Sequence, residues 1–211
     1  MFEETLSQKS KNSLALLGKT GILKNAYLAG GTALALQIGH RISVDFDFFT
    51  EKKFDEKIII RKLKESSLKF QLLRTSAGTI LGSVDKTKFS LFFYDYPLLE
   101  KTETFLGIKI VGLKDIAAMK LAAISDRGTK RDFIDLYFLT VVEKAFFLEE
   151  IFELYEKKFK LIKQNKIHIL KSLVYFEDAE ADTMPNMLKP VSWSKVKLFF
   201  ETEVKKMMQV V

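Results

Sequence analysis

The 211-residue sequence contains no cysteine and only two histidines, His40 and His168. The absence of cysteine excludes disulfide bonds, a thiolate nucleophile and a zinc site with cysteine ligands. Two histidines are also too few for a histidine-rich metal centre. A metal ion that takes part in the mechanism would therefore be a hard ion held by oxygen ligands.

Long hydrophobic runs are absent as well. No stretch approaches the roughly 18 to 20 apolar residues that a membrane-spanning helix needs. The first 25 residues lack the basic start and the uninterrupted apolar stretch of a signal peptide. These absences predict a cytoplasmic protein without membrane association. A hydrophobic content of 47% supplies a packed core, which rules out a disordered or coiled-coil chain.

Acidic residues are fewer than basic ones, 27 against 34, so the formal net charge is +7. Most of this excess lies before Thr140. An excess of cations favours an anionic partner such as a nucleotide or a nucleic acid. Composition alone establishes no more than this preference.

Helix-like and strand-like patterns alternate in the first half of the chain, which predicts an α+β fold with a mixed sheet and flanking helices. Short turns separate the expected strands at 69–75, 79–84 and 88–96, so these three should form an antiparallel edge. The other expected elements of this half are helices at 6–17, 33–38 and 55–65 and strands at 25–29, 43–50 and 107–111.

The second half of the chain shows helical spacing throughout. The expected helices cover residues 115–126, 130–142, 148–161, 166–176 and 193–208, and the polar stretch 177–190 is expected to be a mobile connection. The sequence therefore predicts an α/β core at 1–112 and a helical C-terminal region at 113–211.

Asp45 and Asp47 are the strongest local feature, because they alternate with Val44, Phe46 and Phe48 on an expected strand. A period of two places both carboxylates on one face of the sheet, about 7 Å apart along the chain. Like charges this close repel unless a cation lies between them, and Mg²⁺ suits carboxylate and phosphate oxygens. The alternative is that both side chains face solvent on a half-exposed strand.

The segment Gly30-Gly31-Thr32 stands between an expected strand and an expected helix. Free backbone N–H groups and the helix dipole favour a phosphate at such a turn, and the threonine hydroxyl can donate a further hydrogen bond. The same residues could instead form an ordinary turn with Thr32 as the helix N-cap. Thr32 precedes Asp45 by 13 residues, which would place phosphates beside metal ligands. The chain has no P-loop and no G-x-G-x-x-G turn, so ordinary NTPase and dinucleotide-binding folds are disfavoured.

Charged residues interrupt two expected apolar helices between Lys120 and Asp135. Lys120 and Arg127 lie two helical turns apart on one face, and Asp132 and Asp135 are neighbours on the next helix. Alanines around Lys120 leave room for close packing, so the lysine should be partly buried and need an anionic partner, either an aspartate or a substrate phosphate. The alternative is a structural ion-pair network that ties the two helices together.

These segments together resemble the motifs of the AbiEii/AbiGii toxin-type nucleotidyltransferases, which belong to the DNA polymerase β-like superfamily. The likeness rests on GGTALAL at 30–36 with HRISVDFDFF at 40–49, on KLAAISDR at 120–127 and on DFIDL at 132–136. The order of these motifs and the spacing between them agree with the family pattern over roughly residues 27–139. The resemblance implies a polymerase β-like nucleotidyltransferase sheet with flanking helices, followed by a helical C-terminal region.

The resemblance also implies roles for individual residues. In such enzymes the glycine turn holds the triphosphate, and the aspartate pair binds two Mg²⁺ ions, with Mn²⁺ as a substitute, while an acceptor hydroxyl attacks the α-phosphate. Lys120 would contact the nucleotide phosphates, and Asp132 or Asp135 would orient the nucleotide or act in proton transfer. The implied nucleotide-binding residues are Gly30, Gly31, Thr32, Lys120 and Arg127, and the implied catalytic residues are Asp45, Asp47, Lys120, Asp132 and Asp135.

Enzymes of this superfamily commonly use a third carboxylate on a later strand. Asp95, at the end of the expected strand 88–96, is the candidate for this metal ligand beside Asp45 and Asp47, although it could simply start a turn. His40 and Arg41 precede the aspartate strand and could meet the substrate, or His40 could be an ordinary loop residue.

The predicted function is a Mg²⁺-dependent nucleotidyltransferase that moves an NMP from an NTP to a hydroxyl acceptor, an RNA end or a protein side chain. The resemblance implies the toxin of a type IV toxin–antitoxin or abortive-infection pair, with a cognate antitoxin as partner. One alternative is an inactive module of the same fold that only binds nucleotide or RNA. Another is a metal-dependent phosphohydrolase, which releases phosphate without adding a nucleotide to an acceptor.

Overall fold

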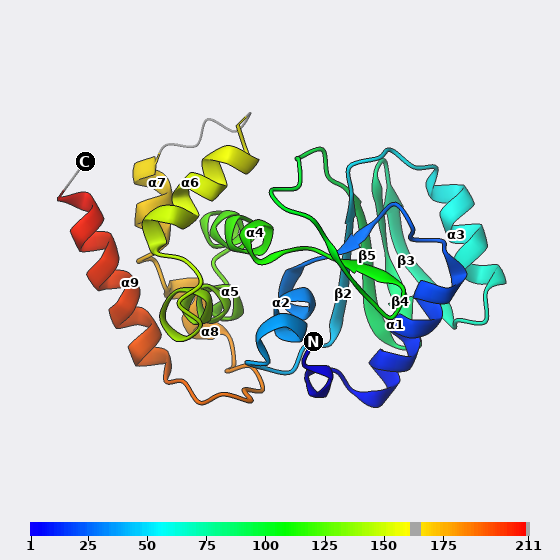
Figure 1. Cartoon of the computed structure of the whole chain (residues 1–211), viewed down its shortest axis with the longest axis horizontal. Coiled ribbons are helices and arrows are strands. Elements are labelled where there is room, and N and C mark those ends of the chain that lie inside the picture. Colours follow the sequence, from blue (N-terminus) through cyan, green and yellow to red (C-terminus); the bar gives the residue numbers. More distant parts are fainter. Residues whose placement is uncertain (161–165, 210–211) are drawn as a thin grey trace. The chain divides into compact units, whose positions relative to one another are not determined.

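The structure is a computed structural model and describes residues 1–160 and 166–209. The chain divides into two compact units, Met1–Gly112 and Leu113–Val211, which we call unit 1 and unit 2. Figure 1 shows strands and helices in unit 1, whereas the elements drawn in unit 2 are helices. The predicted α+β fold, a mixed sheet followed by helices, is confirmed.

Unit 1 is built around a seven-stranded sheet with the strand order β3-β4-β5-β2-β1-β7-β6. β2 pairs in parallel with β5, and β1 with β7, while the other neighbours are antiparallel. The expected antiparallel edge is confirmed as β3, β4 and β5. β6 was not predicted because it carries a single apolar residue, Phe105, and so shows no alternation of apolar and polar residues. The strands are β1 (Tyr27–Leu28), β2 (Asp45–Thr50), β3 (Phe70–Ser76), β4 (Thr79–Val84), β5 (Thr87–Phe93), β6 (Glu103–Phe105) and β7 (Ile108–Ile110).

Three helices flank this sheet, and Figure 1 shows α1 and α3 on one side of it and α2 on the other. Ser7 and Asp55 start α1 and α3, since each side chain accepts a hydrogen bond from a first-turn N–H. Gly21 and Gly39 end α1 and α2 in the left-handed conformation that glycine adopts without strain. The helices are α1 (Gln8–Thr20), α2 (Gly30–Ile38) and α3 (Glu56–Glu65), after a short 3-10 turn η1 (Glu3–Thr5).

The sequence of β2 explains which face of the sheet is closed. Phe46 and Phe48 are completely buried, whereas Asp45 and Asp47 on the other face are half-buried. Each buried phenylalanine stabilises the fold by about 1.5–3 kcal/mol, so a shift of register by one residue would be strongly unfavourable. The expectation that Val44 shares this buried face is wrong, because the strand begins at Asp45 and Val44 is 55% exposed.

Unit 2 contains the helices that the sequence predicts and one that it does not. The expected helix at 130–142 changes to a π-helical turn at Phe138, and the expected helix at 148–161 ends at Lys158, with residue 161 outside the described residues. No helix within 1–160 and 166–209 has the length and apolar character to span a membrane. The elements are α4 (Leu113–Asp126), α5 (Lys130–Tyr137), η2 (Phe138–Val142), α6 (Leu148–Lys158), α7 (Lys166–Ser172), α8 (Glu177–Ala181) and α9 (Trp193–Met208).

The core of unit 2 is aromatic around Phe133 of α5. The centroid of its ring lies 5.2 to 5.9 Å from those of Phe176, Trp193 and Phe200. An ion pair of 2.7 Å between Lys158 and Asp115, both side chains completely buried, joins α6 to α4.

The stretch 177–190, expected to be a mobile connection, begins with α8 and is attached to its neighbours. The backbone N–H of Lys130 donates to Asp182, and the Lys130 ammonium donates to the Asp182 carbonyl. Lys197 of α9 forms an ion pair of 2.6 Å with Glu180. The polar composition of this segment therefore reflects ion pairs at the surface of unit 2 and not a free linker.

Candidate active site

β2 presents Asp45 and Asp47 on the face opposite its buried phenylalanines, as the period of two predicts. The Ser90 hydroxyl on β5 donates a hydrogen bond of 2.5 Å to Oδ1 of Asp47 and thereby fixes its orientation. The other oxygen, Oδ2, faces Gly30, since a Cβ added to that glycine would lie 3.0 Å from it. The Asp47 carboxylate therefore points towards the glycine turn.

The Gly30-Gly31-Thr32 segment is the first turn of α2 itself, because the helix begins at Gly30. N–H groups in the first turn of a helix have no partner within the helix, and the helix dipole adds partial positive charge there. Gly30 has a φ of +64°, a conformation that strains other residues. The strand, glycine turn and helix predicted from the sequence are thus in place.

The Thr32 hydroxyl does not have either of its expected roles. The N-cap of α2 is Ala29, and the hydroxyl of Thr32 donates to the backbone carbonyl of Asp45. Ser43 lies 2.8 Å from the same hydroxyl and can donate to it. Because a hydroxyl has one hydrogen to donate, the side chain of Thr32 positions the start of β2 and is not available as a donor to a phosphate.

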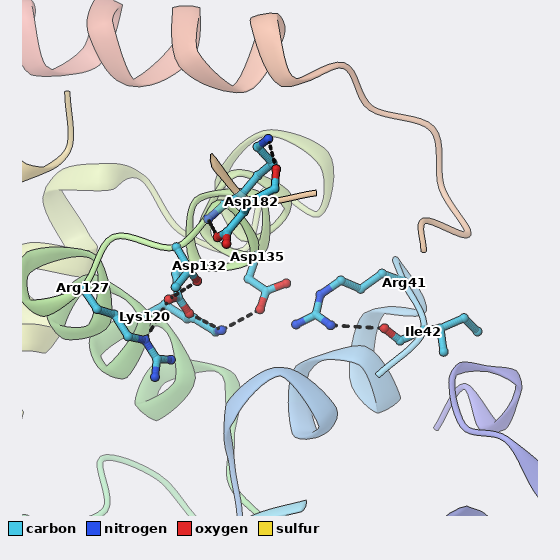
Figure 2. A network of polar contacts seen from close by, with 9 residues as sticks. Arg41, Ile42, Lys120, Arg127, Asp132, Asp135 and Asp182 are labelled. Carbon is cyan, nitrogen blue, oxygen red and sulfur yellow. Dashed lines mark hydrogen bonds and ion pairs between the residues drawn. The ribbon is translucent and has the colours of Figure 1, made fainter. Parts of the chain in front are cut away.

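Arg41 lies against the glycine turn. The residue is 3% exposed, and Nη1 donates a hydrogen bond of 3.2 Å to the Ile42 carbonyl, as Figure 2 shows. A Cβ added to Gly31 would lie 2.2 Å from Nη2 of Arg41, so Gly31 is what allows the guanidinium to approach. The guanidinium thus adds positive charge at the N-terminal end of α2, where the helix dipole is also positive. The neighbouring His40 is completely buried.

Replacing Gly31 by alanine is expected to destabilise unit 1 by about 1–3 kcal/mol, because the buried Arg41 guanidinium must move to admit the new methyl group. Denaturation followed by circular dichroism measures this loss. In an Arg41→Ala background the same substitution should be neutral or stabilising, since alanine favours a helix over glycine by up to about 1 kcal/mol. An equal loss in both backgrounds would show that Arg41 is not the obstacle.

The predicted third carboxylate, Asp95, is not brought to the aspartate pair. In the parallel register of β2 and β5, Asp45 stands opposite Lys88 and Asp47 opposite Ser90. Asp95 is exposed and follows the end of β5 at Phe93, five residues beyond Ser90. That is up to about 16 Å along the chain, so Asp95 lies away from the aspartate pair, and the β5 residue beside Asp47 is Ser90.

The aspartate pair is not part of a larger cluster of metal-ligating side chains. Within residues 1–160 and 166–209, no group of three or more histidines, cysteines, aspartates or glutamates could hold a metal ion. Asp45 and Asp47 therefore offer two hard oxygen donors, which leaves coordination positions for phosphate oxygens and water.

In unit 2 the predicted charged cluster is an ion-pair network around Lys120, shown in Figure 2. The Lys120 ammonium lies 2.8 Å from Oδ1 of Asp132 and 2.6 Å from Oδ2 of Asp135. Arg127 reaches the other oxygen of Asp132 at 3.2 Å. Lys120 and both aspartates are buried, whereas the Arg127 side chain is 64% exposed. The partial burial expected for Lys120 is confirmed, and its partners are the two aspartates of the segment DFIDL at 132–136.

Asp132 is held in its ionised form. Burial alone would raise the pKa of this carboxyl, but the charges of Lys120 and Arg127 and the hydrogen bonds from Lys120 and Thr129 outweigh it and keep the pKa below its ordinary value. A general base works best when its pKa is near the operating pH. The depressed pKa therefore favours a positioning role for Asp132 over proton transfer.

Sequence reasoning missed two polar residues of these clusters, Ser90 and Thr129. The Thr129 hydroxyl donates a hydrogen bond of 2.6 Å to Asp132. A threonine three residues before an acidic residue is a known signal of a helix start, so Thr129 could have been anticipated as the N-cap position of α5, but not its bond to the carboxylate. Ser90 carries no comparable signal, because its contact with Asp47 depends on the pairing of β5 with β2.

Comparison with known proteins identifies the family. Residues 15–90 and 90–205 match the family model of the AbiEii toxin, described as a nucleotidyl transferase of a type IV toxin–antitoxin system. The chain belongs to the AbiEii nucleotidyltransferase toxin family. Family membership confirms the resemblance drawn from the three motifs and makes the chain a transferase of nucleotidyl groups.

Relatives of this AbiEii-family chain are found among proteins and solved structures. It is 43% identical over 208 residues to the uncharacterized protein aq_aa25 of Aquifex aeolicus (strain VF5), covering 97% of this chain and 98% of that protein. Two crystal structures from Helicobacter pylori, one of the protein JHP933, give TM-scores of 0.56 and 0.52 at 18% and 17% identity. They cover 97% of this chain and 99% and 97% of theirs.

The fold is also similar to that of MenT4, the nucleotidyltransferase toxin Rv2826c of Mycobacterium tuberculosis H37Rv. The TM-score is 0.56 at 15% identity, over 94% of this chain and 85% of that one. At this level of identity the likeness concerns the fold, which is that of a nucleotidyltransferase.

Proposed function

We propose that this chain transfers an NMP from an NTP to a hydroxyl group of an acceptor, which is an RNA end or a protein side chain. One observation carries the proposal: Asp45 and Asp47 share a face of the sheet, and Oδ2 of Asp47 faces the first turn of α2. Oxygen ligands for a cation thus lie directly beside N–H groups suited to phosphate oxygens. Membership of a nucleotidyltransferase family supports the same activity.

The donor set of Asp45 and Asp47 fits Mg²⁺, or Mn²⁺ in its place, because both prefer carboxylate, phosphate and water oxygens. Two such ions, when bound, would stabilise negative charge on the attacking and leaving oxygens. The half-buried position of both carboxylates keeps them accessible, and Ser90 holds Asp47 in one orientation.

The residues of unit 1 would bind and orient the nucleotide. The backbone N–H groups of Gly30, Gly31 and Thr32 would hold triphosphate oxygens, and Arg41 would add positive charge at the same turn. The acceptor oxygen then forms a bond to the α-phosphorus, the bond to the β-phosphate oxygen breaks, and pyrophosphate leaves with the displaced electron pair. The hydroxyl proton passes to solvent.

For unit 2 we propose that Asp132 and Asp135 position Lys120, the phosphate-contacting residue that the family resemblance implies. The short distances from the Lys120 ammonium to both carboxylates support this role, as does the depressed pKa of Asp132. Because the family is one of type IV toxin–antitoxin systems, we also propose that the chain acts as a toxin opposed by a cognate antitoxin.

The test is incubation of the purified chain with each α-labelled NTP, Mg²⁺ and either total RNA or cell lysate. Label should appear on an acceptor and require one particular NTP, and an Asp45→Ala variant should give none. Chromatography of the nucleotide products distinguishes transfer, which yields pyrophosphate, from hydrolysis, which yields phosphate. Absence of label transfer with every NTP, and no difference between Asp45→Ala and wild type, would contradict the proposal.

A further inference from the structure

The face of the unit 1 sheet that carries Asp45 and Asp47 continues into aromatic side chains. Phe49 is the residue two beyond Asp47 on β2, and it stands opposite Phe92 of β5 in the parallel register. Tyr27 of β1 stands opposite Phe49 on its other side. Paired residues point to the same face, and so do residues two apart along a strand. Phe49, Phe92 and Tyr27 therefore share the face of the carboxylates.

Phe49 is the centre of a continuous group of rings. Its centroid lies 5.4 Å from that of Phe92, 5.0 Å from that of Tyr94 and 6.2 Å from that of Tyr27. Tyr94 lies in turn 4.8 Å from Tyr96. These separations are those of favourable aromatic pairs. We call Tyr27, Phe49, Phe92, Tyr94 and Tyr96 the aromatic platform.

The aromatic platform is less closed than the opposite face of the same strands. There, Phe46, Phe48 and Phe89 are at most 1% exposed. In the platform Tyr27 is buried, but Phe49, Phe92, Tyr94 and Tyr96 all keep part of their surface exposed. If these rings served only to fill the core, they would be expected to be as deeply buried as the phenylalanines on the opposite face of the sheet.

Exposed lysines lie on the same face, one beside the aromatic platform and one beside the aspartate pair. Lys88 of β5 stands opposite Asp45, and Lys109 of β7 stands opposite Tyr27. Aromatic rings with cations at their margin are the combination that binds nucleotides of single-stranded nucleic acid, with the rings stacking on bases and the cations attracting phosphates. The charge of this face therefore suits a nucleotide and not an apolar peptide.

We propose that the aromatic platform is a nucleobase-binding subsite, with Phe49 and Phe92 stacking on a base whose phosphate lies at the aspartate pair and the glycine turn. Phe49 is one pleat repeat, about 7 Å, from Asp47, which is within reach of a base attached to that phosphate. The base belongs to the incoming NTP or to the terminal nucleotide of an RNA acceptor. This subsite rests on the proposed function, because its phosphate position is the one assigned there.

The experiment compares Phe92→Leu with wild type by calorimetry in the presence of Mg²⁺. Leucine keeps the apolar character but removes the ring, so the affinity for the ligand whose base occupies the platform, an NTP or an RNA end, should fall about tenfold, within the range for loss of one base–aromatic stack. The affinity for inorganic tripolyphosphate, which has no base, should not change. Phe93→Leu is the matched control, since Phe93 is the next residue of β5 and points to the opposite face.

A second arm identifies the source of the base. Short RNA oligonucleotides that end either in an ordinary nucleotide or in an abasic one are titrated into the same variants. If the platform binds the acceptor, Phe92→Leu weakens only the ordinary oligonucleotide and leaves NTP affinity unchanged. If it binds the incoming nucleotide, only NTP affinity falls.

The subsite is disproved if Phe92→Leu and Phe49→Leu, both folded by circular dichroism, bind NTPs and ordinary oligonucleotides as wild type does. It is also disproved if tripolyphosphate affinity falls in parallel with NTP affinity, because the rings would then act on the phosphate site or on the fold. If wild type binds no tripolyphosphate, the triphosphate site of the proposed function is disproved. The titrations with ordinary and abasic oligonucleotides then still test whether the aromatic platform binds a base. Should Phe92→Leu not fold, Phe49→Leu provides the same comparison.

Discussion

Replacing Asp47 by asparagine should lower nucleotidyl transfer by about 10²- to 10³-fold or more, the loss typical of removing one electrostatic group from an active site. Asparagine has the shape of aspartate and keeps an oxygen that can accept the hydrogen bond from Ser90. The substitution therefore removes negative charge opposite Gly30 with little change in packing. Rates of label transfer at several Mg²⁺ concentrations measure the effect.

Ser90→Ala is the matched control for Asp47→Asn. It removes the hydrogen bond but keeps the charge, and the expected loss of activity is at most about 10- to 10²-fold, since one hydrogen bond to a charged group contributes about 1.5–3 kcal/mol. Equal losses in the two variants would mean that orientation, and not charge, is the contribution of Asp47. Wild-type activity in Asp47→Asn would remove the aspartate pair from the mechanism.

Replacing either aspartate by asparagine also distinguishes an enzyme from a module that only binds nucleotide or RNA. Removing a carboxylate lowers the negative charge of the surface, so a binding module should hold an anion equally well or better after Asp45→Asn or Asp47→Asn. An enzyme of the proposed kind should lose the Mg²⁺-dependent part of its NTP affinity. Calorimetry with and without Mg²⁺ distinguishes the two outcomes.

Features set by local sequence were predictable. Alternation along β2 predicted the shared face of Asp45 and Asp47, and the glycines predicted the turn before α2. The spacing of Asp132 and Asp135 predicted that they are neighbours, because positions three or four apart on a helix lie on one face. Their contact with Lys120 joins α5 to α4, so the sequence offered it only as an alternative to a contact with a substrate phosphate.

Features that depend on pairing between distant segments were not predictable. Asp95 lies away from the aspartate pair because the register of β5 against β2 brings Ser90 opposite Asp47, and no local pattern sets that register. The approach of Arg41 to Gly31 is a contact between a loop and a helix. The aromatic platform likewise depends on the order of β5, β2 and β1 in the sheet, because no one strand carries all of its rings.

Replacing Lys120 by methionine should destabilise unit 2 by about 3–5 kcal/mol, because it removes the ammonium that two buried carboxylates share. A loss of this size is a large fraction of the roughly 5–15 kcal/mol that stabilises a typical domain. Trp193, the only tryptophan of the chain, packs on Phe133 within unit 2, so its fluorescence reports the unfolding of this unit. Denaturant titrations of wild type and Lys120→Met measure the difference.

The pH dependence of this loss tests its electrostatic origin. Because the folded-state pKa of Asp132 is lowered, the stability that the ion pair contributes is fully present above the ordinary value of about 3.9 and is lost as the pH falls through the lower folded value. The gap between wild type and Lys120→Met should therefore be constant near neutral pH and narrow in acid. Adding Asp132→Asn and Asp135→Asn to Lys120→Met should recover much of the stability, since no buried charge is then left uncompensated. A difference in unfolding free energy below about 1 kcal/mol that does not vary with pH would be that of an exposed ion pair. The aspartates would then hold Lys120 too weakly to position it.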